Sequence, residues 1–162
     1  MAQHIDERRQ ESVWDYPRPP RIEPSTRHIT VGFNGQRIAD TRAAYRILET
    51  SHPPVYYLPP DDVRTDLLLP AEGASYCEFK GLAKYLSVRV GDREANRAVW
   101  SYADPNPAYN AIAGYLAFYP SQMDRCTVDG EEVQAQPGDF YGGWITREIA
   151  GPFKGGPGTS GW

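Results

Sequence analysis

The sequence is poor in the residues that build metal sites and disulfide frameworks. It contains two cysteines and three histidines among 162 residues. Cys77 and Cys126 lie 49 positions apart, which fits neither the paired cysteines of a zinc site nor a disulfide-rich scaffold. The histidines show none of the short spacings typical of metal ligands. We therefore interpret both cysteines as free thiols and expect neither a metal nor a cofactor.

The chain also lacks long apolar runs and an excess of basic charge. Its mean hydropathy is -0.60, and no stretch approaches the roughly 18 apolar residues that a membrane-spanning helix requires. The start, MAQHIDERRQ, is too charged for the apolar region of a signal peptide. A net charge of -4 gives no general attraction to the phosphates of nucleic acids. These absences predict a soluble, cytoplasmic protein that binds neither membrane nor nucleic acid.

Aromatic and turn-forming residues, by contrast, are abundant. The chain has 15 Pro, 15 Gly, 11 Tyr, 4 Trp and 5 Phe. Aromatic residues favour β-strands, and Gly and Pro separate strands with turns. No long helical period is found, and the length suits one ordinary domain. We expect a mainly β domain of compact antiparallel sheets built from hairpins, with one or two short helical turns.

Three pairs of short runs are joined by dipeptides typical of tight turns. The pairs are HITVGF with QRIAD, LAKYLSVRV with REANRAVWSY, and RCTV with EEVQA. Their connections are Asn34-Gly35, Gly91-Asp92 and Asp129-Gly130. Asn-Gly and Asp-Gly favour the backbone conformation of a two-residue hairpin turn. Each pair therefore predicts an antiparallel hairpin.

The longest hairpin, residues 81–102, makes the most specific predictions. Strand alternation separates an apolar face from a mixed face. The apolar face carries Leu82, Lys84, Leu86, Val88 and Val90, and the mixed face carries Ala83, Tyr85, Ser87 and Arg89. Continuous pairing from the turn places Trp100 and Tyr102 near residues 80–82.

The segments between the first two hairpins are less distinctive. Residues 41–49 have the composition of a short helix, but they closely follow a hairpin and run into prolines, so a strand is favoured. Residues 55–58 are typical of another strand. Asp61 and Asp62 then stand where a helix start prefers carboxylates, which predicts one or two helical turns through Leu67.

Composition divides the chain into three parts. Residues 1–24 form a proline-rich N-terminal arm, residues 25–147 the β core, and residues 148–162 a Gly- and Pro-rich tail that docks on the core. Prolines keep the arm out of helices and central strands. Trp14 and Tyr16 are expected to anchor it to the domain or to a partner; a disordered leader is the alternative.

The candidate functional residues are polar groups beside aromatics. Lys80 stands between Phe79 and Gly81 at the mouth of the long hairpin. The residues that we expect to bind a ligand are Tyr57, Lys80, Tyr85, Trp100 and Tyr102. An aromatic-walled cleft with one cation suits anion binding or proton transfer, although a surface lysine lying over a ring would fit the same pattern. The candidate catalytic residues are Lys80, Asp61 and Asp62; the two adjacent aspartates would face opposite ways on a strand, so we do not expect them to share a metal ion.

Several longer motifs resemble a known family. They include ESVWDYPRPPRIEP, CEFKGLAKYLSV, AVWSYADPNP, GYLAFYP and YGGWITREIAGPFKGGPGTSGW. Together they resemble DUF427, a family of unknown function sometimes labelled nucleotidyltransferase-like. The resemblance implies a compact, mainly β fold akin to the β-tent folds of the Mss4-like group, with no established activity. Its motif positions are Tyr57, Pro59, Asp62, Val63, Lys80-Gly81, Tyr85, Trp100, Tyr102 and Pro105. The chain lacks both the Gly-Ser and Asp-x-Asp motifs of polymerase-type nucleotidyltransferases and the cysteine pairs of zinc-bearing β-tent proteins.

Three functional hypotheses remain open. The preferred one is a binding module that holds a small polar or anionic molecule in the aromatic cleft. The second is an enzyme that acts on a small metabolite, with Lys80 and Asp61 or Asp62 as acid and base. The third is a homo-oligomer or scaffold in which the arm and the tail reach over a neighbour.

Overall fold

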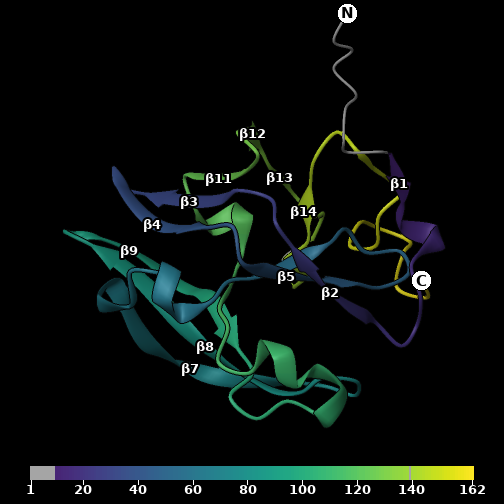
Figure 1. Ribbon diagram of the computed structural model, residues 1–162, viewed down its shortest axis with the longest axis horizontal. Helices are drawn as coiled ribbons and strands as arrows, with labels where there is room; N and C mark the ends of the chain where they lie inside the picture. The colour runs from purple at the N-terminus through teal and green to yellow at the C-terminus, as the bar shows by residue number, and fades with distance from the viewer. Residues whose placement is uncertain (1–9, 139) are drawn as a thin grey trace, which may run out of the picture.

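The structure is a computed structural model that describes residues 10–138 and 140–162 (Figure 1). Its strands form five sheets, which confirms the mainly β prediction. The helical segments among these residues are short 3-10 turns: Val13–Asp15, Pro60–Asp62, Thr65–Leu67, Pro107–Ile112 and Pro120–Gln122. Two of them follow Pro59, where one or two turns through Leu67 are expected.

Two four-stranded antiparallel sheets supply most of the core. One has the order β10-β9-β8-β7 and consists of β7 (Leu68–Cys77), β8 (Gly81–Val90), β9 (Arg93–Ser101) and β10 (Ala117–Phe118). The other has the order β12-β11-β3-β4 and consists of β3 (Ile29–Phe33), β4 (Gln36–Thr41), β11 (Arg125–Val128) and β12 (Glu131–Glu132). In Figure 1, the sheet of β7, β8 and β9 lies below that of β3, β4 and β11.

Three smaller sheets complete the fold. The three-stranded sheet has the order β2-β5-β6, from β2 (Arg21–Ser25), β5 (Ala44–Leu48) and β6 (Val55–Tyr57). The pairs are β13 (Gln134–Ala135) with β14 (Trp144–Ile145), and β1 (Glu11–Ser12) in parallel with β15 (Ile149–Ala150). The segment 41–49 thus contains a strand, as expected. β2 is an edge strand, the position that tolerates its Pro24.

The predicted hairpins form, and two of their turns have left-handed backbone at both central residues. The φ angles are 48° at Asn34 and 78° at Gly35, and 50° at Asp129 and 83° at Gly130. Such angles define the type I′ turn, whose twist matches that of the paired strands. The turn residues therefore determine where the chain reverses.

The register of the β8–β9 hairpin differs from the prediction. Trp100 pairs with Tyr85, and the pairing shifts between Leu86 and Val88 because β9 contains a bulge there. Arg97, in the bulge, has a φ of 55°, and its N–H donates to Ser87 Oγ at 3.1 Å. The expectation that Trp100 lies near residues 80–82 is therefore wrong, because the bulge moves the end of β9 along β8.

The bulged hairpin also buries different faces along its length. Near its start, Ala83 and Tyr85 of the mixed face are buried, whereas Leu82 is 50% exposed. Further along, Val88 of the apolar face is fully buried. The expected apolar face is thus correct only for the half of β8 that packs on the main core.

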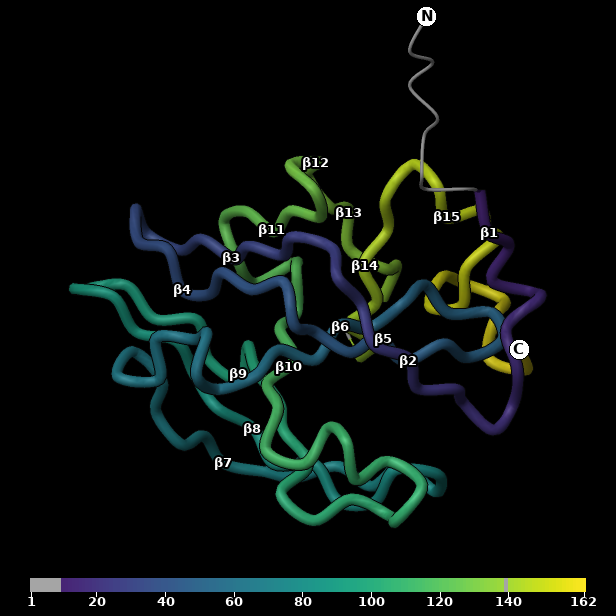
Figure 2. Tube along the Cα trace, in the orientation of Figure 1, coloured from purple at the N-terminus to yellow at the C-terminus, as the bar shows by residue number. Residues whose placement is uncertain are grey.

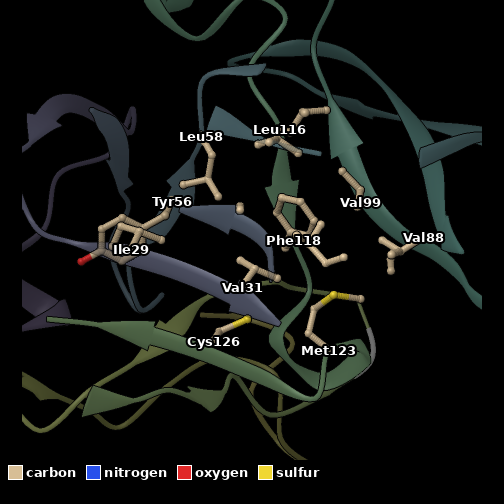
Figure 3. Packing of buried hydrophobic residues seen from close by; sticks show 14 of the residues in the cluster. Ile29, Val31, Tyr56, Leu58, Val88, Val99, Leu116, Phe118, Met123 and Cys126 are labelled. Carbon is tan, nitrogen blue, oxygen red and sulfur yellow. The ribbon is translucent and has the colours of Figure 1, made fainter. Parts of the chain in front are cut away.

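The main core lies between the two four-stranded sheets. Figure 3 shows Val31 and Cys126 on one side of it and Val88 and Val99 on the other, with Phe118 between them. All five side chains are at most 3% exposed. A second cluster of buried residues is mainly aromatic; it lies where β6, β8 and β9 meet and includes Tyr57, Tyr85, Trp100, Tyr102 and Tyr109.

The two ends of the described chain pack together. The tube in Figure 2 follows β1 and the final segment to the same side of the molecule. Trp14 Nε1 donates to the Pro152 carbonyl at 2.9 Å, and the Trp14 ring contacts Trp162 edge-on at a centroid distance of 5.2 Å. Tyr16 is buried, whereas Trp14 is 42% exposed. The tail is thereby held beside the N-terminal arm.

Among residues 10–138 and 140–162, no helix combines the length and apolar character needed to cross a membrane.

Candidate functional site

A cavity of about 270 Å³ lies beside the aromatic cluster. Its walls come from the end of β6, the β7–β8 turn, the paired strands β8 and β9, and segments near the C-terminus. All five residues expected to bind a ligand line it: Tyr57, Lys80, Tyr85, Trp100 and Tyr102. The structure therefore brings these residues together from four separate parts of the chain.

The aromatic wall is held by ring contacts and one buried hydrogen bond. Trp100 Nε1 donates to Tyr57 Oη at 3.2 Å, and the Trp100 ring lies against Tyr119 at a centroid distance of 4.6 Å. The Tyr102 ring also contacts the Tyr57 ring, at a centroid distance of 6.3 Å. Burial raises the pKa of the Tyr57 hydroxyl well above its usual value, so this group is neutral at physiological pH.

Gly142 allows the Trp100 ring to occupy its position. A Cβ at Gly142 would lie 2.7 Å from Trp100 Cζ3, still closer to Cη2, and 3.3 Å from Tyr119 Cδ1. Only a residue without a side chain leaves room for both rings. The neighbouring Gly143 leaves room for Gln136 and Pro53 in the same way, because a Cβ at this position would lie 2.5 Å from Gln136 Oε1 and 2.8 Å from Pro53 Cγ.

Lys80 occupies a fixed turn at the edge of the cavity. Asn106 N–H donates to the Lys80 carbonyl at 2.9 Å, and Asn106 Nδ2 donates to the Phe79 carbonyl at 2.7 Å. The Lys80 residue is 8% exposed. Its ammonium group makes no hydrogen bond, ion pair or ring contact with any residue that the structure describes. Most of the Lys80 side chain is thus out of contact with water, and its charge is free to act as the counterion of an anion in the cavity.

A second cation, Lys154, enters the cavity from the tail and was missed from the sequence. Its Nζ lies 5.5 Å from the centre of the Tyr141 ring and donates to the Trp162 carbonyl at 3.4 Å. Its backbone N–H donates to the Ser51 carbonyl at 2.9 Å, which fixes the tail against the loop after β5. The only sequence signal was a lysine within the motif GPFKGGPG.

His52 also lines the cavity, although the sequence suggested no role for it. Burial lowers the pKa of its imidazole to about 4, and the charges of Lys154, Arg18 and Lys80 act in the same direction. Three cations therefore lie close enough to act on His52, and their charges favour an anion in the adjacent space. The Pro53-Pro54 pair that follows His52 was the nearest sequence signal of a constrained loop.

The carboxylates are distributed differently from the expectation. Asp61 and Asp62 are exposed on the 3-10 turn after β6 and do not line the cavity, and Asp62 instead accepts a hydrogen bond from Thr41 Oγ1 at 2.7 Å. The structure therefore does not bring Lys80 together with either aspartate. Glu49 lines the cavity, but its Oε2 lies 3.5 Å from Arg18 Nε, which offsets its charge.

The two cysteines are free and lie in different surroundings. Cys77 lines the cavity and is partly exposed, whereas Cys126 is buried in the main core, where burial raises its thiol pKa to about 12. Within the described ranges, no group of three or more His, Cys, Asp or Glu side chains is placed to hold a metal ion.

Comparison with known proteins identifies a family but no characterised relative. No curated protein matches the chain. The model of the domain of unknown function DUF427 matches residues 21–129. This range covers more than half of the chain and contains His52 and the five expected ligand-binding residues, whereas Gln136 and Lys154 lie beyond it. The chain belongs to the DUF427 family.

Proposed function

We propose that this domain binds a small anionic molecule in the aromatic cavity, with Lys80 as its counterion. The observation that carries the proposal is Lys80, a residue 8% exposed whose ammonium group has no partner among the described residues, at a cavity walled by Tyr57, Trp100 and Tyr102. The charges of Lys154 and Lys80, which both act on His52, support the choice of an anion.

The aromatic wall supports a ligand that also has a flat apolar part. Aromatic rings bind such groups by contact over a large area, while a few polar groups determine orientation. The hydrogen bond between Trp100 and Tyr57 keeps two of these rings fixed before any ligand arrives. Benzoate and phenyl phosphate are therefore suitable probes, and benzamide is the neutral counterpart of benzoate.

The proposal is tested by calorimetric titration of the wild type and of two lysine variants. Lys80→Gln removes the proposed counterion, whereas Lys84→Gln removes the same charge from an exposed position on β8. Charge-assisted hydrogen bonds contribute roughly 1.5–3 kcal/mol, so Lys80→Gln should weaken benzoate binding about 10- to 100-fold. Lys84→Gln should leave it unchanged, and benzamide should bind the wild type and Lys80→Gln equally.

Two results would contradict the proposal. One is benzoate binding of equal affinity in the wild type and Lys80→Gln. The other is a failure of both benzoate and phenyl phosphate to bind the wild type at millimolar concentration.

A further inference from the structure

The orientation of the Gln136 side chain is determined by its backbone partners. Its Oε1 accepts from the Gly143 N–H at 3.0 Å, and its Nε2 donates to the Lys154 carbonyl at 2.8 Å. A backbone N–H can only donate and a carbonyl can only accept, so the amide cannot be reversed without losing both bonds. The second hydrogen on Nε2 remains free to donate elsewhere.

That hydrogen determines the protonation of His52. Gln136 Nε2 lies 3.2 Å from His52 Nδ1. Because Gln136 Nε2 is a donor, His52 Nδ1 must accept, and the neutral imidazole therefore carries its proton on Nε2. Protonation of Nδ1 would set two donors against each other.

The charged groups around His52 favour the same neutral state. Lys80, Lys154 and Arg18 all disfavour an imidazolium at this position. The acid that faces the ring is Glu49, whose Oε2 lies 3.8 Å from His52 Nε2 and 3.5 Å from Arg18 Nε. This separation from His52 exceeds a hydrogen bond, so Nε2–H is not held by the carboxylate.

The tautomer argues against a role for His52 as a base. Cys77 lines the same cavity, and a thiol beside a histidine is a common nucleophile pair. A base that acts through Nε2 needs a lone pair on that atom. In His52 the lone pair is on Nδ1 and accepts from Gln136, so the ring offers a hydrogen-bond donor instead.

We propose that His52 is a specificity-determining residue of the cavity, fixed by Gln136 as a neutral N–H donor that selects a fully ionised oxyanion, a carboxylate or a phosphate. This inference rests on the proposed function, because it assigns a second contact to the same anion. Lys80 supplies charge, which attracts any anion. His52 supplies a directional donor, which rewards an oxygen that carries no proton of its own.

The tautomer is measurable without any ligand. Long-range ¹⁵N–¹H correlation spectra at pH 7 distinguish the two neutral forms of histidine and the imidazolium. We expect His52 as the neutral form protonated on Nε2. Detection of a proton on His52 Nδ1 would overturn the proposal, whatever the binding experiments show.

Two substitutions separate the contribution of the donor from that of the ring. His52→Gln can place an amide N–H near the position of Nε2, whereas the shorter His52→Asn places its amide near Nδ1 and leaves the cavity without this donor. Loss of one hydrogen bond to a charged group should weaken benzoate binding about tenfold in His52→Asn. The affinity of His52→Gln for benzoate should remain within about threefold of the wild type. This corresponds to roughly half the loss of binding free energy expected for His52→Asn.

His28→Asn is the matched control, because His28 binds Asp40 at 2.6 Å and does not line this cavity. Far-UV circular dichroism and thermal unfolding establish that each variant is folded. If benzoate binding depends on Lys80 but is equal in the wild type and His52→Asn, the inference about His52 is wrong and the proposed function stands. If Lys80→Gln has no effect, the proposed function itself fails.

Discussion

Replacing Gly142 with alanine tests the packing of the cavity wall. The added Cβ would lie 2.7 Å from Trp100 Cζ3, whereas ordinary contacts begin at 3.4 Å. The indole must therefore retreat by about 1 Å, and its contact with the Tyr119 ring, at a centroid distance of 4.6 Å, limits that movement. Because the hydrogen bond from Trp100 to Tyr57 is already 3.2 Å long, such a shift would break it.

The loss of stability expected for Gly142→Ala has two parts. Overpacking of a rigid interior costs about 1–3 kcal/mol. Leaving the buried Tyr57 hydroxyl and the Trp100 N–H without a partner costs a further 1–3 kcal/mol or so. Since relaxation reduces the two terms together, we expect Gly142→Ala to lower the free energy of unfolding by about 2–4 kcal/mol.

Urea unfolding followed by far-UV circular dichroism measures the effect. With a slope of about 2 kcal/mol/M, the midpoint should fall by about 1–2 M while the slope stays unchanged. Gly161→Ala is the control, because its Cβ would meet no atom within 4 Å and its backbone is not left-handed. Both variants restrict the unfolded chain equally, so their difference isolates the clash. A Gly142→Ala midpoint equal to that of Gly161→Ala would refute the reasoning.

Two further predictions concern charge. The ratio of the rates at which Cys77 reacts with iodoacetate and with iodoacetamide should be about threefold higher in the wild type than in Lys80→Gln, because a nearby cation attracts the charged reagent. Mass spectrometry of the alkylated protein measures this ratio, and buried Cys126 should stay unmodified. An unchanged ratio would count against a positive cavity. Burial acts to raise the pKa of Glu11, but hydrogen bonds from Arg46 outweigh it and hold this pKa below its usual value. The resulting stability is present above the usual pKa of a glutamate and is lost as pH falls through the lower folded pKa. Urea unfolding between about pH 3 and 6 should therefore show that acid lowers the free energy of unfolding less in Glu11→Gln than in the wild type. Parallel plots of this free energy against pH would contradict a lowered pKa of Glu11.

The sequence by itself determined the elements whose cause is local. Asn34-Gly35 and Asp129-Gly130 reverse the chain because these residues tolerate left-handed backbone, and that preference needs no distant partner. The prolines around residue 59 end β6 for a similarly local reason. The aromatic and lysine motifs also identified five residues that line one cavity.

Tertiary structure alone decided the register of β9 and the polar side of the cavity. The bulge at Arg97 depends on a hydrogen bond to Ser87 from the neighbouring strand, so alternation within one strand cannot reveal it. His52 and Gln136 are 84 positions apart and meet because the β13–β14 pair packs against the loop after β5, where the Trp144 N–H donates to the Pro54 carbonyl at 2.8 Å. A turn is specified by the dihedral preferences of adjacent residues, whereas a site of this kind is specified by which surfaces pack together, and the latter depends on the whole chain at once.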